Sequence, residues 1–94
     1  MRVLGRDKLA KFAKSHAQAR KPLSYWLLVA EEAAWSGPQA VKTRYPDASF
    51  LARNRVIFNI KGNSFRLVVE AFYENGILIV EWVGTHAEYD RRRL

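Results

Sequence analysis

The residues best suited to chemistry lie in the last third of the chain. Arg66 follows a tight turn at the start of a strand-like segment, and His86, Tyr89 and Asp90 follow the next such segment. An imidazole, a phenol and a carboxylate above one arginine are a set that cleavage of an RNA phosphodiester can use. One group removes the 2′-hydroxyl proton, another protonates the leaving 5′ oxygen, and the guanidinium stabilises the charge on the phosphorus centre.

Three predicted strands must position these residues. Segments 53–60, 65–73 and 77–83 alternate apolar and other side chains. Residues 61–64 are predicted to form a tight turn, and Asn75-Gly76 is a hairpin signal. The result is an antiparallel meander, one face of which is predicted to pack against the core. The residues of that face are Val56, Phe58, Ile60, Phe65, Leu67, Val69, Ala71, Leu78, Val80 and Trp82.

The register of this meander predicts what lies on its other face. Two-residue loops at both turns place polar residues in two rows, Asn59–Arg66–Thr85 and Arg55–Glu70–Glu81. We interpret the first row as the candidate site and the second as charge compensation within the sheet. Phe72 is predicted on the same face, where it either stacks on a base or packs under the C-terminal tail.

Helices are predicted to cover the opposite face. Apolar residues recur at helical spacing between residues 6 and 15, and a second helix has Pro22 in its first turn and runs to about Trp35. A short helix over residues 39–44 follows, and residues 2–4 are a candidate strand. The sequence therefore predicts a single α+β domain over residues 1–94, with two N-terminal helices on a small antiparallel sheet and a short C-terminal helix or tail.

Composition narrows the class of protein. The 94 residues are 49% hydrophobic, which excludes disorder for lack of apolar material, and no apolar run is long enough for a membrane span. The early charges predict no signal peptide. The absence of cysteine and the presence of only two histidines, His16 and His86, disfavour a metal site, and no cofactor is expected. The net charge of +7 indicates a polyanionic partner, either nucleic acid or an acidic protein.

Basic and amide residues near the predicted strands and in the tail are candidates for RNA contacts: Arg53, Arg55, Asn59, Lys61, Asn63, Arg91, Arg92 and Arg93. We interpret the basic residues of the N-terminal helices as a solvated surface: Lys8, Lys11, Lys14, Arg20 and Lys21. The catalytic candidates have structural alternatives. In these, Arg66 pairs with a strand carboxylate, His86 caps a helix, and Tyr89 packs at the edge of the core.

Three segments of the chain resemble a known family. They are Trp35-Ser36-Gly37-Pro38, the stretch FNIKGNSFRLVV that begins at Phe58, and His86-Ala87-Glu88-Tyr89-Asp90. Together they resemble the HigB toxins of bacterial type II toxin–antitoxin systems, over nearly the whole chain. The resemblance implies a compact RelE-like fold.

The resemblance also implies an activity. It is that of a ribosome-dependent mRNA interferase of the bacterial cytoplasm, which cuts mRNA in the ribosomal A site without a metal or cofactor and leaves 2′,3′-cyclic phosphate and 5′-hydroxyl ends. The implied partner is a HigA-type antitoxin with a helix-turn-helix domain, and operator DNA is bound only through the toxin–antitoxin complex. No membrane is involved.

Site residues carry over from the family by their motifs. Arg66 matches the strand arginine that acts on the scissile phosphate, and Lys61 and Arg53 or Arg55 match basic positions. His86, Tyr89 and Asp90 match a C-terminal His-x-x-Tyr-Asp pattern. The resulting expectation is that His86 or Tyr89 is the general base or acid, that Arg66 with Lys61 stabilises the phosphorane, and that Asp90 orients His86 or supports the tail.

Two other classes of function compete with this expectation. One is a non-catalytic basic module that binds RNA or an acidic protein segment. The other is a DNA-binding repressor, which is disfavoured because no helix-turn-helix with a polar recognition helix is evident.

Overall fold

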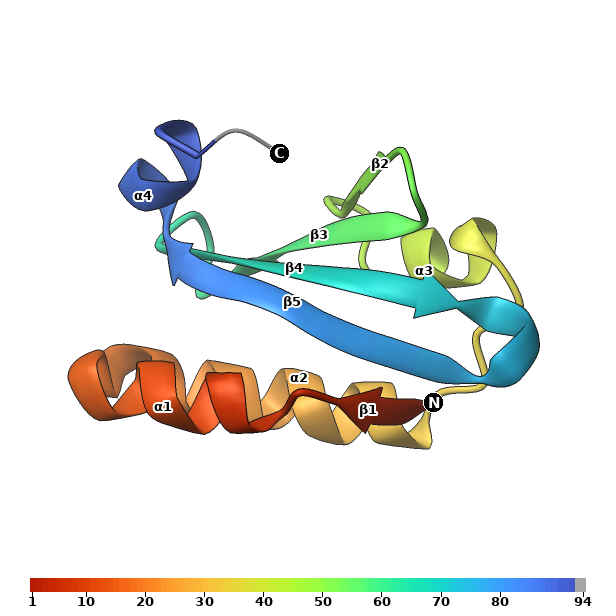
Figure 1. Cartoon of the computed structure of the whole chain (residues 1–94), viewed down its shortest axis with the longest axis horizontal. Coiled ribbons are helices and arrows are strands. Elements are labelled where there is room, and N and C mark those ends of the chain that lie inside the picture. Colours follow the sequence, from red (N-terminus) through yellow and green to blue (C-terminus); the bar gives the residue numbers. More distant parts are fainter. Residues whose placement is uncertain (93–94) are drawn as a thin grey trace.

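The sheet divides the molecule into a helical side and an open side. The computed structural model describes residues 1–92, and Figure 1 shows α1 (Asp7–Ser15) and α2 (Arg20–Glu32) along one face of the sheet, with α4 (His86–Asp90) above the other. A 3₁₀ turn (Ala17–Ala19) joins α1 to α2, and α3 (Pro38–Arg44) follows. The predicted α+β class and the short C-terminal helix are confirmed.

The sheet has five strands and is mixed. Its spatial order is β1-β5-β4-β3-β2, with bounds β1 (Arg2–Leu4), β2 (Ser49–Leu51), β3 (Arg55–Ile60), β4 (Phe65–Phe72) and β5 (Ile77–Thr85). β1 runs parallel to β5, and the other three pairings are antiparallel. The prediction of a wholly antiparallel sheet is therefore wrong at β1. β2, which has three residues, was not predicted.

The strand predicted over residues 53–60 begins later, at Arg55. Arg53 and Asn54 have φ values of 63° and 59°, in the left-handed region that a strand does not use. They form the tight turn between β2 and β3, which pair in register from Leu51 and Arg55. Arg53 thus lies at the tip of a hairpin instead of within a strand.

The second helix ends before its predicted limit at Trp35. Its last residue is Glu32, and Ala33 is already extended. The Met1 amino group donates to the carbonyl oxygens of Ala30, at 3.0 Å, and of Ala33. Carbonyls at the end of a helix lack the full set of intrahelical donors, so the Met1 amino group, which precedes β1, supplies donors from outside the helix.

The register of β3 and β4 is as predicted. Asn59 lies opposite Arg66 and Arg55 lies opposite Glu70. Lys61 and Gly62 take positive φ values of 53° and 61° and close the turn between the strands. The Ser64 amide donates to the Lys61 carbonyl at 3.1 Å, so the chain reverses within four residues.

The register of β4 and β5 differs from the prediction. Tyr73–Asn75 forms a 3₁₀ turn closed by Gly76 at a φ of 65°, and Phe72 pairs with Ile77, so the loop has four residues and not two. The ladder then has an irregularity where Val69 pairs with Val80 but Val68 pairs with Trp82. Glu81 is therefore the extra residue of a β-bulge.

Both predicted cross-strand pairs of this ladder are wrong as a result. Glu70 lies opposite Ile79 instead of Glu81, and Arg66 lies opposite Gly84 instead of Thr85. The bulge also reverses the alternation of side chains beyond it, because one extra residue exchanges the two faces of a strand. Trp82, predicted toward the core, pairs with Val68, which alternates with Leu67 and Val69 of the core.

The core fills the space between the sheet and the helices. Its centre is Phe58, which is 1% exposed and packs edge-on against Trp26 at a centroid distance of 5.3 Å. Trp35 and Tyr45 contact the same ring at 6.2 and 5.2 Å. The core residues predicted for β3, β4 and β5 are confirmed apart from Trp82. This packing fixes the sheet, and hence the positions of the side chains on its other face.

Candidate active site

The sheet face opposite α1 and α2, here called the outer face, carries the candidate site. Ile57 and Val68 form its apolar floor. They are 4% and 0% exposed, yet they do not belong to the core cluster between the sheet and the helices. They pair with each other across β3 and β4. The charged residues of this face therefore surround an apolar centre where water is partly excluded, which strengthens electrostatic interactions.

Trp82 stands on this face because of the bulge. Its ring lies so close over Gly84 that a Cβ at residue 84 would overlap with Cζ2 of the indole. The indole also lies 6.1 Å from the Tyr89 ring, and the Arg92 guanidinium lies 5.0 Å from the indole centroid. Gly84 is thus the residue type that lets the indole lie flat along β5.

Arg66 rises from β4 beside this aromatic cluster. Its guanidinium carbon lies 4.7 Å from the centre of the Tyr89 ring. Its Nε is buried and finds no hydrogen-bond partner among residues 1–92. The described part of the chain also brings no carboxylate within ion-pair distance of Arg66. The alternative in which Arg66 forms an ion pair with a strand carboxylate is therefore wrong among the described residues.

α4 places Tyr89 above Arg66, and its first turn is held firmly. Thr85 and Glu88 form a capping box, with the Thr85 amide donating to Glu88 Oε1 at 2.8 Å and the Glu88 amide donating to Thr85 Oγ1 at 3.1 Å. The His86 amide donates to the Ser64 carbonyl at 3.2 Å, which ties the helix to the β3–β4 turn. Hydrogen bonds from the backbone and side chain of Thr85 lower the pKa of Glu88 below its ordinary value.

His86 and Asp90 lie on one side of α4 because they are four residues apart. His86 Nδ1 is 3.3 Å from Asp90 Oδ2. A carboxylate at Nδ1 favours the tautomer with the proton on that nitrogen and leaves Nε2 free to accept one. The His86 side chain is 36% exposed, so a substrate can reach it.

Arg55 and Asn59 on β3 are already engaged. Arg55 Nη1 lies 3.8 Å from Glu81 Oε1, and its Nε donates to the Ala52 carbonyl at 3.2 Å. Asn59 Nδ2 donates to Asp47 Oδ2 at 3.2 Å. The expected charge compensation between Arg55 and Glu81 is present. The bulge brings the two side chains together, whereas the prediction relied on a regular pairing of Glu81 with Glu70.

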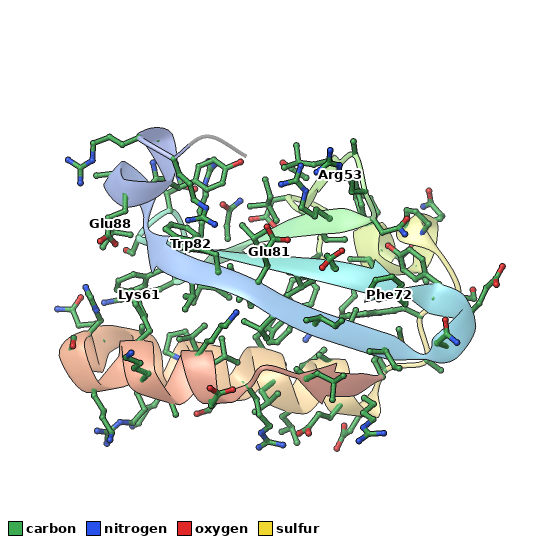
Figure 2. All side chains as sticks on the ribbon, in the orientation of Figure 1. Arg53, Lys61, Phe72, Glu81, Trp82 and Glu88 are labelled. Carbon is green, nitrogen blue, oxygen red and sulfur yellow. The ribbon has the colours of Figure 1, made fainter. Side chains whose placement is uncertain are left out.

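The remaining predicted residues are dispersed. Lys61 Nζ donates to Gln18 Oε1 at 2.8 Å on the helical side of the sheet, and Figure 2 shows it below β5, so it does not join Arg66. Arg53 stands at the far side of the outer face from α4 (Figure 2). Asn63 is exposed in the β3–β4 turn, and Arg91 is exposed after α4. Arg93 lies outside the described residues.

Sequence reasoning did not find Trp82 as a site residue and named Phe72 as an aromatic that either stacks on a base or packs under the tail. Phe72 lies at the end of β4 that is farthest from α4 (Figure 2). A signal for Trp82 was present. Gly84 follows it at a spacing of two, and a glycine inside a strand marks a bulge or a close approach by another group.

Comparison with known proteins identifies the family. A model of the HigB toxin family, described as the RelE-like toxic component of a toxin–antitoxin system, matches residues 19–92. The chain belongs to the HigB toxin family. No curated protein matches the chain. As a toxin of a toxin–antitoxin system, this HigB-family protein has an antitoxin as its partner. Among the described residues, no helix combines the length and apolar character needed to cross a bilayer.

Gly84→Ala is expected to displace Trp82 and to lower the free energy of unfolding by about 1–3 kcal/mol, because the new methyl group and the indole cannot share the space. Urea unfolding measures the free energy, and near-UV circular dichroism reports the tryptophan environment. Gly37→Ala is the matched control. Residue 37 has an extended φ of 179°, and no atom lies within 4 Å of the place that its Cβ would take, so a change within about 0.5 kcal/mol is expected. Equal effects of the two substitutions would contradict this account of Trp82.

Acid is expected to loosen the first turn of α4. Because the pKa of Glu88 is lowered in the folded protein, the ionised carboxylate stabilises the cap above its unfolded pKa. This contribution is lost as the pH falls through the lower, folded pKa. The Thr85 amide resonance should therefore titrate with a midpoint below 4.5, the ordinary value, and this titration should vanish in Glu88→Ala. A midpoint at or above 4.5 would show that the cap does not hold the carboxylate.

Proposed function

We propose that this toxin is an mRNA interferase, an endoribonuclease that cleaves mRNA on the translating ribosome with the outer face as its active site. The observation that carries the proposal is that Arg66 lacks a polar or acidic partner among the described residues. Its guanidinium rests against Tyr89, its Nε has no acceptor among residues 1–92, and no described carboxylate pairs with it. A partly buried cation without a counterion is costly, and a phosphate supplies the paired oxygens that suit a guanidinium.

The proposed reaction is an internal transfer at phosphorus. The ribose 2′-oxygen attacks the adjacent phosphorus, the bond from phosphorus to the 5′ oxygen breaks, and the products end in a 2′,3′-cyclic phosphate and a 5′-hydroxyl. This reaction needs one group to take the 2′-hydroxyl proton and one to give a proton to the leaving oxygen. It consumes no water in this step.

The side chains of α4 suit these two roles. His86 is the proposed base, since Asp90 faces Nδ1 and leaves Nε2 to accept the proton. Tyr89 is the proposed acid, and its ring also holds Arg66 in position. Arg66 stabilises the charge that develops on the phosphorane. Lys61 has no part in this scheme, because its ammonium group is bound to Gln18.

The partners follow from the same proposal. The net charge of +7 favours mRNA and ribosomal RNA as polyanionic partners and an acidic antitoxin surface. The proposed antitoxin is of the HigA type, operator DNA is bound through the complex of the two proteins, and the proposed site of action is the bacterial cytoplasm, where translation occurs.

Arg66→Ala is expected to reduce cleavage by roughly 100- to 1,000-fold, because one preorganised donor to the transition state is lost. The measurement is growth arrest on expression in bacteria, together with mapping of new mRNA 5′ ends and their end chemistry. Arg2→Ala, which removes an exposed strand arginine of β1, is the matched control and should retain toxicity. Full toxicity of well-expressed Arg66→Ala would overturn the assignment. Bound but uncut RNA with the wild-type protein would favour a non-catalytic binding module.

His86→Gln is expected to lower cleavage by roughly 100- to 10,000-fold, the usual contribution of a positioned acid or base. Glutamine can still hydrogen-bond to Asp90, so the loss would report proton transfer and not the position of α4. Tyr89→Phe is the companion variant, since it keeps the ring on Arg66 and removes only the hydroxyl. Cleavage retained in His86→Gln but lost in Tyr89→Phe would move the role of base to Tyr89.

A further inference from the structure

A cleft lies between α1 and the free edge of β5, on the other side of Trp82 from the proposed active site. β1 pairs with β5 only from Ile77 to Ile79, so the rest of that edge faces α1 without a neighbouring strand. The cleft has a volume of about 410 Å³, within the range of small-ligand sites. The residues of its lining that matter here are Lys8, Lys11, Phe12, His16 and Trp82.

The edge of β5 in this cleft does not suit an added peptide strand. Lys8 Nζ donates to the carbonyl oxygens of Val80 and Glu81, at 3.4 and 3.3 Å. These are acceptors that a pairing strand would need. The bulge at Glu81 also breaks the regular spacing of the edge. A lysine and a bulge are both devices that block pairing at sheet edges, so the side chains and not the backbone offer the binding surface.

Those side chains combine aromatic surface with positive charge. Phe12 and His16 stack with their ring centroids 3.9 Å apart and their planes at 8°. Lys8 and Lys11 stand exposed on the same wall, and Trp82 lies on the opposite one. Aromatic surfaces beside a line of cations are the combination by which proteins hold single-stranded nucleic acid, through base stacking and phosphate contacts.

Trp82 makes the cleft continuous with the proposed active site. Its indole contacts Tyr89, which in turn lies on Arg66. Arg66 pairs with Gly84, two residues along β5 from Trp82. With about 3.3 Å per residue along a strand and about 4.8 Å between strands, the two positions are roughly 8 Å apart. Neighbouring nucleotides of an extended strand can cover such a distance.

We infer that the α1–β5 cleft binds a nucleotide of the RNA that adjoins the scissile phosphate, with its base against Trp82 and its phosphate on Lys11. The inference rests on the proposed function, since it places the flanking part of the same substrate. It assigns a binding role to Lys11, which the sequence alone indicated as part of a solvated surface.

Lys11→Glu and Lys14→Glu provide the test. Both residues are exposed on α1 and both substitutions change the net charge equally, but Lys14 lines the groove between α1 and α2 and not this cleft. The probe is a fluorescein-labelled RNA of about eight nucleotides with 2′-O-methyl riboses, which cannot be cleaved by 2′-oxygen attack. Its affinity is measured by fluorescence anisotropy at two salt concentrations.

Lys11→Glu is expected to weaken binding by at least roughly tenfold. The slope of log affinity against log salt concentration should fall by about one, because one phosphate contact is lost. Lys14→Glu should change the affinity by less than about threefold. Tryptophan fluorescence gives a second readout. Trp26 and Trp35 are 1% and 7% exposed, so quenching by the bound RNA should come from Trp82 and should be lost in Trp82→Leu.

The outcomes separate this inference from the proposed function. Equal affinities of Lys11→Glu and Lys14→Glu, or no binding of the probe to the wild-type protein, would overturn the inference even if the wild-type protein cleaves mRNA. Binding that depends on Lys11 in a protein that cuts no mRNA would keep the cleft and overturn the proposed function. Preferential binding of a polyglutamate peptide, lost in Lys11→Glu, would assign the cleft to an acidic protein segment instead.

Discussion

The arrangement of the outer face depends on one extra residue in β5. Because Glu81 is bulged out of the ladder with β4, Trp82 leaves the row of core residues that contains Leu78 and Val80. Its indole lies instead over Gly84, and Tyr89 of α4 packs beside it. A regular strand would bury Trp82 against the helices and would leave α4 without this aromatic support. The bulge thus determines both what α4 rests on and where Tyr89 meets Arg66.

The same bulge distributes charge unequally between two arginines of the outer face. It brings Glu81 to 3.8 Å from Arg55, so that Arg55 is compensated, whereas Arg66 on the next strand has Tyr89 as its neighbour and no described carboxylate. Glu70 and Glu81 show that the fold can supply acids on this face. A cation that is left without one beside an apolar floor interacts strongly with an incoming anion, since the local dielectric is low. This contrast is the reason why we propose a functional role for Arg66 and a structural one for Arg55.

The parts of the structure that could be predicted from the sequence are those set by local chemistry. Glycine in the 61–64 turn and strict alternation around it fixed the β3–β4 register, and with it the pairing of Asn59 with Arg66. The β4–β5 register could not be predicted, because Asn75-Gly76 matches a two-residue turn while the chain forms a 3₁₀ turn from Tyr73. The bulge depends on packing between layers, which no periodicity shows. Lys61 fits the site by sequence position, but a hydrogen bond to Gln18 directs it to the helical side.

Arg92 links the end of α4 to the ring of Trp82. Its guanidinium lies over Trp82, a contact worth about 0.5–1 kcal/mol at an exposed site. A base stacked on the same ring is worth about 1–3 kcal/mol. A base of the inferred nucleotide would therefore gain at least as much from the indole as Arg92 does, so the Arg92 contact does not oppose the inferred binding.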